Sequence, residues 1–212
     1  TPLTSLIIEL ELLIYKDVDK CDPQLKSINS ALSDAKRMVR LFNSILDLSK
    51  ASYDKSNIVF KSLRVDDVVF EAKESLESLN SEYNIDIIYE GSNLESGDDS
   101  WLIVYANDYL LKIAFFNLIE NACKYSLDNR CVVVIGFLDN KLSIKFLDNG
   151  EGFETSDLEK VFTPFYRGSN SEGKDGFGIG LALVKKIVTL HDANIYIDKN
   201  CDSGGSIVTI IF

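Results

Sequence analysis

Four polar side chains share one face of a predicted helix near the middle of the chain. Asn117 and Asn121 are four residues apart, and Lys124 and Tyr125 follow Asn121 by three and four residues, so all four lie along one helical stripe. Asparagine amides offer carbonyl oxygens to a hard divalent cation, and lysine offers a point charge to phosphate. Two asparagines on one helix face are also typical of a solvated polar stripe, and this helix alone does not decide between the two interpretations.

A second group follows a predicted strand and comprises Asp148, Gly150 and Gly152, in the sequence Asp-Asn-Gly-Glu-Gly. An aspartate at a strand end can accept a hydrogen bond from the amino group of adenine. The glycines allow the backbone to pass close to a flat ring. A plain glycine-rich turn has the same composition and remains an alternative.

Two further groups lie nearer the carboxyl end. Arg167 is the second-last residue of the sequence Phe-Thr-Pro-Phe-Tyr-Arg-Gly, a hydrophobic anchor that runs into a polar loop. Gly176, Gly178, Gly180 and Leu181 then lead into a predicted helix. Glycines before a helix N-terminus expose backbone amides and the positive end of the helix dipole to phosphate. The small, polar and charged stretch between the two groups is typical of a mobile lid.

In this order and spacing the four groups resemble the N, G1, F and G2 boxes of histidine kinases, which belong to an ATPase superfamily shared with DNA gyrase and MutL. The resemblance covers about residues 53–212 and implies an ATP site in an α/β sandwich of the Bergerat type. Its cofactors are then ATP and Mg²⁺. By the same resemblance Asn121 holds Mg²⁺ together with Asn117, and Lys124 and Tyr125 line the phosphate and ribose side.

The resemblance also assigns the remaining groups. Asp148 reads adenine, and Gly150 and Gly152 shape the pocket around it. Arg167 meets the γ-phosphate. The residues expected to wrap the phosphates are Gly176, Gly178, Gly180 and Leu181.

The residue type at position 117 distinguishes members of this superfamily that transfer a phosphoryl group from members that hydrolyse ATP. The hydrolytic members carry a glutamate at this position, which activates water, and an amide cannot accept that proton at neutral pH. Glu120 precedes Asn121 by one residue and therefore lies on a different helix face. The sequence favours phosphoryl transfer to an external acceptor, which needs mainly positioning and charge neutralisation. A hydrolytic ATPase is the less favoured alternative.

The chain as a whole predicts an α+β fold in which strands and helices alternate after about residue 53. Asp139-Asn140 is typical of a hairpin turn between two strands. The expected strands are Ile58–Val65, Ile85–Tyr89, Trp101–Tyr105, Cys131–Leu138, Leu142–Leu147, Asn194–Asp198 and Ser206–Ile211. The expected helices are Asp66–Glu82, Asp108–Tyr125 and Ile179–Leu190, and a polar turn separates the second and third strands.

Residues 1–52 have a different pattern, in which apolar residues step by three and four. These residues are Leu3, Leu6, Leu10 and Leu13, followed after a break by Leu25, Ile28, Leu32, Ala35, Val39, Phe42 and Leu46. Asp22-Pro23 suits the start of the second helix. The pattern predicts a helical hairpin that completes a four-helix bundle with a second copy of the chain. A monomer whose hairpin packs on the downstream domain is the alternative. The predicted domains are therefore residues 1–52 for dimerisation and phosphotransfer and residues 53–212 for ATP binding.

The first three residues indicate where the phosphoacceptor histidine lies. Thr1-Pro2-Leu3 matches the end of the His-Glu-x-x-Thr-Pro-Leu motif of histidine kinases, which places the acceptor histidine four residues before Thr1. We therefore expect a fragment of a longer protein, in which Thr1 positions water for dephosphorylation of the partner. His191 is the single histidine in the chain. It follows the last predicted helix, and we expect it to be structural.

Composition narrows the partners. The 22 basic and 33 acidic residues give a net charge of −11, which argues against a nucleic-acid partner. The four cysteines form no CxxC pair and suggest reduced thiols, and no apolar run reaches the length of a membrane helix. The expected partners are a second copy of the chain and a response-regulator receiver domain, with membrane anchoring of a cytoplasmic portion only through other parts of the parent protein. A nucleotide-binding dimeric scaffold that transfers nothing is the alternative function.

Overall fold

The computed structural model describes residues 58–91, 99–139, 141–154, 156–168, 174, 176–200 and 204–212, together with eight helical residues among the first 46. The chain divides into two compact units, residues 1–47 and 48–212. The division falls slightly before the predicted boundary at residue 52.

The described residues of the first unit are helical, as the sequence predicts. They include Ile28, Leu32, Ala35, Val39 and Leu46, which belong to the predicted seam. Ala35 is buried and Leu46 is exposed. The other seam positions, and Thr1, lie outside the described residues.

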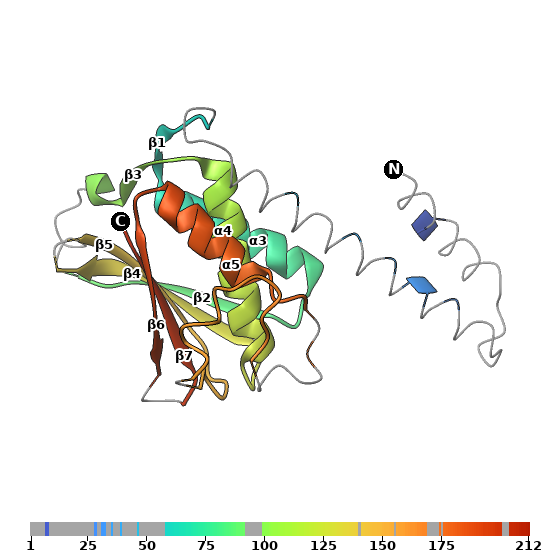
Figure 1. Ribbon diagram of the computed structural model, residues 1–212. Helices are drawn as coiled ribbons and strands as arrows, with labels where there is room; N and C mark the ends of the chain where they lie inside the picture. The colour runs from blue at the N-terminus through green and yellow to red at the C-terminus, as the bar shows by residue number, and fades with distance from the viewer. Residues whose placement is uncertain are drawn as a thin grey trace. The chain divides into compact units, whose positions relative to one another are not determined.

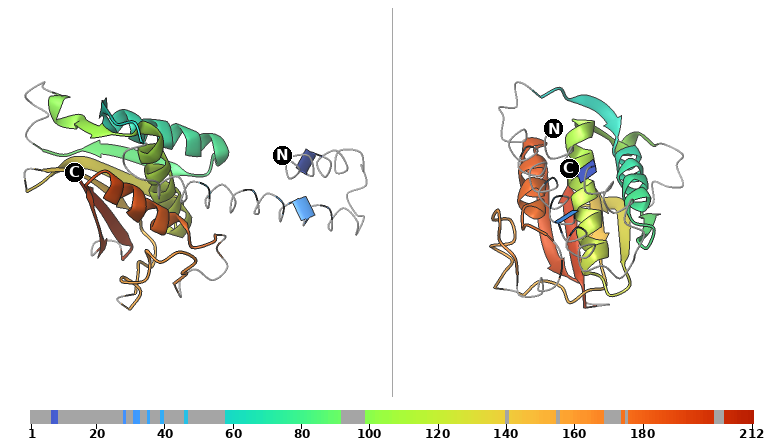
Figure 2. Two further views of the ribbon diagram at one scale, coloured as in Figure 1. Left: turned by 45° about the horizontal axis from the view of Figure 1, so that its top comes forward. Right: turned by 90° about the vertical axis from the view of Figure 1, so that its right-hand side faces the viewer.

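The second unit is a two-layer α/β sandwich (Figure 1). Its five-stranded sheet has the order β2-β4-β5-β7-β6, in which only the β2–β4 pair is parallel. The strands are β2 (Asn84–Tyr89), β4 (Arg130–Leu138), β5 (Lys141–Leu147), β6 (Asn194–Lys199) and β7 (Ser206–Ile211). Helices α3 (Val65–Leu79), α4 (Asp108–Tyr125) and α5 (Gly180–Leu190) lie side by side over one face of the sheet (Figure 2). The predicted α+β class is confirmed.

Helix α4 occupies the middle of the helical layer, between α3 and α5. Asn107 caps its N-terminus, because the side-chain oxygen accepts a hydrogen bond from Leu110 N–H at 2.9 Å. Its buried residues, which pack in the core between the layers, are Leu110, Leu111, Ala114, Phe115, Leu118, Ile119, Ala122 and Cys123. The apolar stripe is wide, and only the remaining face is left for polar side chains.

The third predicted strand is wrong in its bounds. Trp101 belongs to a short 3-10 helix, Asp99–Leu102, and the strand β3 begins after it, at Ile103, and ends at Ala106. β3 pairs with β1 (Lys61–Arg64) in a separate two-stranded sheet, whereas β2 pairs with β4. Trp101 packs edge-to-face with Tyr89 and at a tilt against Phe137, with 6.4 and 5.1 Å between ring centroids. This aromatic packing holds the short helix against β2 and β4 of the main sheet, and β3, which follows it, belongs to the separate sheet.

Acid should destabilise the second unit through Asp66 in the first turn of α3. Burial raises the pKa of this carboxyl, but hydrogen bonds from Arg64 and Tyr89 outweigh burial and leave its pKa below the ordinary value. The stabilising contribution is therefore present above about pH 4 and is lost as the pH falls through the lowered pKa. Asp66→Asn should cost about 1–3 kcal/mol at pH 7 and flatten the loss of stability below about pH 4, measured by urea unfolding. An unchanged acid profile would contradict this role.

The described cysteines are poor metal ligands or nucleophiles. Burial raises the pKa of the Cys123 thiol to about 12 and that of Cys131 well above its ordinary value, so both stay protonated at neutral pH.

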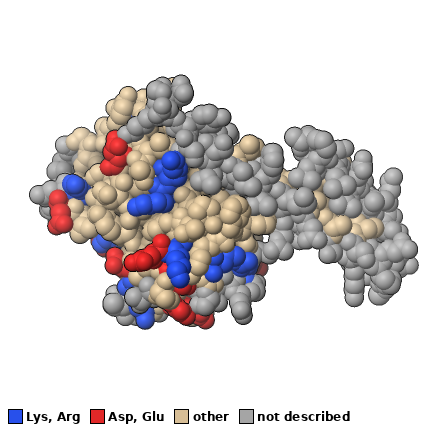
Figure 3. All heavy atoms as spheres, viewed as in Figure 1, with Lys and Arg blue, Asp and Glu red and all other residues tan. Residues whose placement is uncertain are grey.

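Within the described ranges no group of three or more His, Cys, Asp or Glu side chains is placed to hold a metal ion. In the same part of the chain, no helix is both long and apolar enough to cross a membrane. The face in Figure 3 carries lysine and arginine interspersed with carboxylates.

Candidate nucleotide-binding site

The predicted stripe on α4 is present and half-buried. Asn117, Asn121, Lys124 and Tyr125 are all of intermediate exposure, between the buried core positions of the same helix. Asn117 Nδ2 donates to the carbonyl of Ile113 at 2.8 Å, which directs its own carbonyl oxygen outward from the helix backbone. The half-buried stripe leaves room for a ligand, and its role as a ligand-facing surface stays a prediction.

The start of α5 lies against this stripe. A Cβ added to Gly180 would come within 2.9 Å of Asn117 Oδ1 and 3.7 Å of Asn121 Nδ2. Gly180 thus leaves room for the two amides at the helix start. The N-cap residue Ile179 makes no side-chain hydrogen bond to the first turn, and the amides and dipole of a helix N-terminus can bind an anion. Leu181 packs against the hydrophobic core and anchors the first turn of α5.

Asp148 is held in a fixed position just after β5. It is 6% exposed, and its Oδ1 accepts from Gly150 N–H at 2.8 Å and from Ser206 N–H at 3.2 Å. The Ser206 hydroxyl donates to Oδ2, and Asn200 Nδ2 donates to the backbone carbonyl of Asp148 at 3.3 Å. A buried carboxylate with this many donors is fixed in orientation, as a residue that recognises a base must be.

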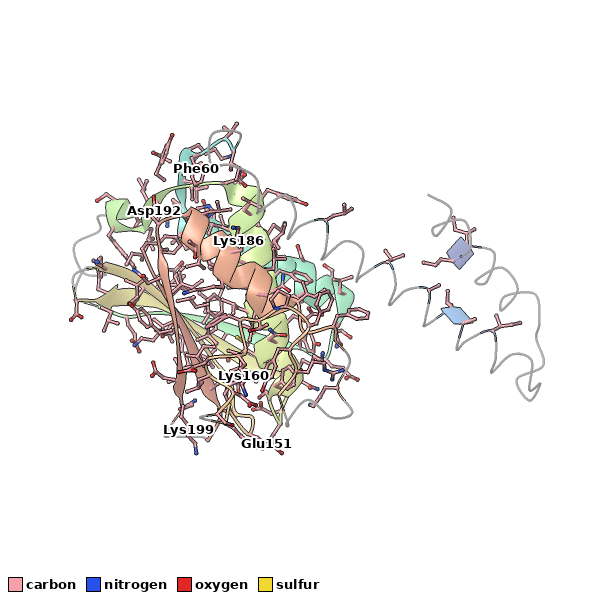
Figure 4. All side chains as sticks on the ribbon, in the orientation of Figure 1. Phe60, Glu151, Lys160, Lys186, Asp192 and Lys199 are labelled. Carbon is pink, nitrogen blue, oxygen red and sulfur yellow. The ribbon has the colours of Figure 1, made fainter. Side chains whose placement is uncertain are left out.

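Glycines bring three backbone segments together around Asp148. A Cβ on Gly150 would lie 2.3 Å from the carbonyl oxygen of Tyr125, and one on Gly205 would lie 2.0 Å from the carbonyl oxygen of Asp148. Gly152 has φ +74, and a Cβ there would lie 2.8 Å from the carbonyl oxygen of Gly205. The loop after β5 therefore packs on both the end of α4 and the β6–β7 turn. Glu151, which Figure 4 labels together with Lys160 and Lys199, marks this end of the domain.

The two glycine-bearing loops near Arg167 are joined to each other. Gly178 has φ +67, and a Cβ there would lie 2.3 Å from the carbonyl oxygen of Tyr166. Phe165 N–H donates to the carbonyl of Gly178 at 2.8 Å. Phe165 itself is 65% exposed, at φ 66. The segment that ends in Arg167 is thus fixed beside the segment that begins α5.

Cationic side chains gather where α4 ends. Lys174 Nζ donates to the carbonyl of Lys124 at 2.7 Å, and Arg167 Nη2 donates to the carbonyl of Lys174 at 2.7 Å. A Cβ on Gly176 would lie 2.9 Å from Lys124 Nζ. Burial raises the pKa of Tyr125, and the nearby charge of Arg167 opposes that shift. Lys124, Arg167 and Lys174 supply positive charge in a chain of net charge −11, as a polyphosphate site requires.

Glu120 contributes to the electrostatics on another part of α4. Burial raises the pKa of Tyr83, and the negative charge of Glu120 raises it further. The same charge raises the pKa of Cys123. That Glu120 is a poor substitute as a base for water held at Asn117 stays a prediction from the sequence.

His191 lies at the opposite end of the domain. Its Nε2 accepts from Asn107 N–H at 3.1 Å, so the proton is on Nδ1, which donates to the carbonyl of Ile187 at 2.8 Å. The Phe60 ring packs on it, with 5.1 Å between ring centroids. In Figure 4, Phe60 and Asp192 lie at one end of the domain and Glu151 at the other. The imidazole joins the end of α5 to the cap of α4, which supports the predicted structural role.

Replacing His191 should therefore lower stability and leave the nucleotide site intact. His191→Leu removes the acceptor of the Asn107 amide and should cost about 1–3 kcal/mol in urea unfolding. Mg-ATP affinity should stay within about twofold. Asp192→Asn is the matched control, because asparagine tolerates the φ of 54 at that position. Phosphate incorporation at His191 would contradict the structural assignment.

Some residues of this site carry no signal that the sequence analysis used. Ser206 and Asn200 fix Asp148, and Gly205 makes room for it, yet all three lie more than fifty residues further along the chain than Asp148. The Gly204-Gly205 pair before the last strand was the available signal for a close backbone approach. Lys174 likewise contacts α4 only in the folded chain, where its Nζ donates to the carbonyl of Lys124. Thr1 lies outside the described residues.

The residues of this site fit ATP and Mg²⁺, the two ligands that the sequence analysis expects. Asn117 presents an oriented carbonyl oxygen, and Gly180 keeps open a space that a Cβ would fill. Amide oxygens are ordinary ligands for Mg²⁺ when the nucleotide phosphates supply others. A buried, fixed aspartate between glycine segments, the start of helix α5 beside the amide stripe and a group of cations are together typical of an ATP-binding domain of the Bergerat class.

Two family models match the chain. Residues 106–212 match the model described as "Histidine kinase-, DNA gyrase B-, and HSP90-like ATPase", and residues 1–53 match the "His Kinase A (phospho-acceptor) domain". The chain therefore belongs to the histidine kinase family and carries the two parts of a sensor histidine kinase catalytic core.

Curated relatives of the chain are named as sensory or histidine-protein kinases. The chain is 29% identical to the adaptive-response sensory kinase SasA of Synechocystis, over 97% of this chain and 54% of that protein. It is 27% identical to the signal transduction histidine-protein kinase ArlS of Staphylococcus aureus, over 96% of this chain and 44% of that protein. The chain thus spans about half the length of these relatives.

Solved structures support the fold. The mycobacterial sensor histidine kinase MprB matches with a TM-score of 0.60 and 21% identity, over 73% of this chain and 97% of that one. Full-length ShkA, crystallised in complex with AMPPNP, matches with a TM-score of 0.70 and 14% identity, over 99% of this chain and 42% of that one.

Proposed function

We propose that this chain is the kinase core of a two-component sensor, which binds Mg-ATP and transfers the γ-phosphoryl group to a histidine. The observation that carries the proposal is the packing of Gly180 against Asn117, because it joins the α4 stripe to the start of α5 in one site. The first element offers amide oxygens, and the second offers backbone amides and a helix dipole. The family membership and the named relatives agree with this activity.

Each group has a role in the proposed cycle. Asp148 accepts a hydrogen bond from adenine, and Gly150 and Gly152 let the base approach the backbone. Asn117 and Asn121 hold Mg²⁺, which when bound would neutralise charge on the phosphates.

The phosphate chain is contacted by basic side chains and by backbone amides. Lys124, Tyr125 and Arg167 face the ribose and phosphates. The glycine segment that begins at Gly176 wraps the phosphates.

Transfer is favoured over hydrolysis for a reason local to Asn117. Its Nδ2 donates to a backbone carbonyl, and the side chain has no basic atom at neutral pH. Glu120 is one residue before Asn121 and is a poor substitute for a base at position 117. A phosphoryl group held in this site would therefore await an external nucleophile, which in the proposed function is the histidine four residues before Thr1.

The partners follow from the first unit and from the family. Residues 1–52 form the dimerisation and phosphotransfer hairpin, and residues 53–212 form the ATP-binding domain. The hairpin pairs with a second copy to make a four-helix bundle. A response-regulator receiver domain takes the phosphoryl group onto an aspartate, and Thr1 positions water for the reverse, phosphatase step. We place the core in the cytoplasm of a parent anchored in the membrane.

The experiment is phosphorylation of a chain extended upstream by its native residues. Incubation with Mg-[γ-³²P]ATP should label a histidine, giving a phosphoramidate that is stable in alkali and lost in acid. Asp148→Ala should abolish the label. An extended chain that binds Mg-ATP yet stays unlabelled, or that has no histidine four residues before Thr1, would instead support a nucleotide-binding scaffold.

A further inference from the structure

The loop that follows α4 contacts the loop that carries Asp148. Ser126 is the residue after the last turn of α4, where its backbone N–H donates to the carbonyl of Ala122 at 2.9 Å. It is 3% exposed. Its hydroxyl donates to Asp128 Oδ1 and accepts from Asn149 N–H at 3.4 Å. One buried hydroxyl thus joins two segments that are distant in the sequence.

Asp128 completes the connection with its other oxygen. Asn149 Nδ2 donates to Asp128 Oδ2 at 3.5 Å, a long hydrogen bond that adds to the contact at the Asn149 backbone. The hydrogen bond from Ser126 lowers the pKa of Asp128, so both of its oxygens are acceptors at neutral pH. Asn149 is therefore held at its backbone by Ser126 and at its side chain by Asp128.

Asn149 lies between the two residues that form the proposed adenine pocket, Asp148 and Gly150. On one side of it, Asp148 is fixed by Ser206. On the other, Gly150 passes so close to the end of α4 that a Cβ would lie 2.3 Å from the carbonyl oxygen of Tyr125. Nothing larger than glycine fits there, so the loop is held against α4 by the neighbouring hydrogen bonds rather than by side-chain packing at Gly150.

We infer that Ser126 and Asp128 are positioning residues that hold the Asp148 loop against α4 and so set the affinity of the site for the adenine amino group. The inference rests on the proposed function, because it assumes that Asp148 recognises adenine. Neither residue contacts the base in this account. Both act through Asn149, whose displacement would move the carboxylate of Asp148 relative to the ribose and phosphate groups bound at α4.

The test compares two nucleotides on the same variants. Mg-ATP carries the 6-amino group, whereas Mg-purine riboside triphosphate lacks it and is otherwise identical. Ser126→Ala and Asp128→Ala should each weaken ATP binding by about five- to tenfold, as expected for misplacing one hydrogen bond to a charged group. Binding of the purine analogue should stay within about twofold. Ser126→Thr, which keeps the hydroxyl, should bind ATP as the unaltered chain does.

Asp67→Ala on the exposed face of α3 is the matched control, and it should change neither affinity. An equal loss for both nucleotides would reduce Ser126 and Asp128 to structural residues and overturn the inference. Unchanged ATP affinity in both variants would also overturn it, while the proposed function would stand. Failure of the unaltered chain to bind Mg-ATP would overturn the proposed function and the inference together.

Discussion

Replacing Asp148 by asparagine should weaken Mg-ATP binding on the order of 100-fold. Asparagine keeps one acceptor oxygen for the amides of Gly150 and Ser206. Its amino group can donate to the Ser206 hydroxyl, so the fold should survive. That amino group then faces the amino group of adenine, donor against donor, and the loss of a charge-assisted hydrogen bond costs about 1.5–3 kcal/mol. Displacement of a fluorescent ATP analogue measures the effect.

The same variant should change the choice of base. The 6-oxygen of guanine is an acceptor, which the new amino group can satisfy, so the preference for ATP over GTP should fall. Asp67→Asn on α3 is the control and should leave both affinities unchanged. If Asp148→Asn binds ATP as tightly as the unaltered chain, Asp148 does not read adenine.

Gly178→Ala should separate phosphate binding from base binding. Gly178 has φ +67, and the added Cβ would lie 2.3 Å from the carbonyl oxygen of Tyr166 and 2.8 Å from the carbonyl carbon of Phe165. The backbone must shift, at a cost of about 1–3 kcal/mol, and the glycine segment before α5 moves with it. ATP affinity should fall by about thirtyfold, while adenosine, which lacks phosphates, should bind nearly as before.

Gly91→Ala provides the matched control. Gly91 also has a positive φ, +131, but among the described residues a Cβ there would meet just Phe137 Cδ2, at 3.9 Å, and Gly91 follows β2 rather than the phosphate segment. Gly91→Ala should lower the free energy of unfolding slightly and leave the affinity for ATP unchanged. An equal loss of ATP and adenosine in Gly178→Ala would show that the segment has no separate role with the phosphates.

Local patterns predicted most of the fold. Helix α4 has the predicted bounds, Asp108–Tyr125, because a wide apolar stripe and a capping asparagine define it within one stretch of sequence. The β4–β5 hairpin was predicted from its turn and from the flanking apolar runs. The pairing of β1 with β3 was not predicted, because the two strands are distant in the sequence and no local periodicity encodes such a contact.

The site also has some features that local sequence predicts and others that depend on tertiary contacts. The positions of Asn117 and Asn121 follow from helix geometry and were therefore predictable. Their closeness to Gly180 is a tertiary contact that only the resemblance to histidine kinases implied. Ser206 and Asn200 could not be assigned to Asp148 at all, since β7 must first pair with β5 to bring Ser206 beside it.

Titration of the intact chain with ATP by isothermal calorimetry, with and without Mg²⁺, tests the central claim most directly. The account predicts one ATP per chain with a dissociation constant in the micromolar range, corresponding to about −8 kcal/mol, and weaker binding without Mg²⁺. Absence of binding at millimolar ATP in the presence of Mg²⁺ would contradict it, because the aspartate loop, the amide stripe and the glycine segment would then form no nucleotide site.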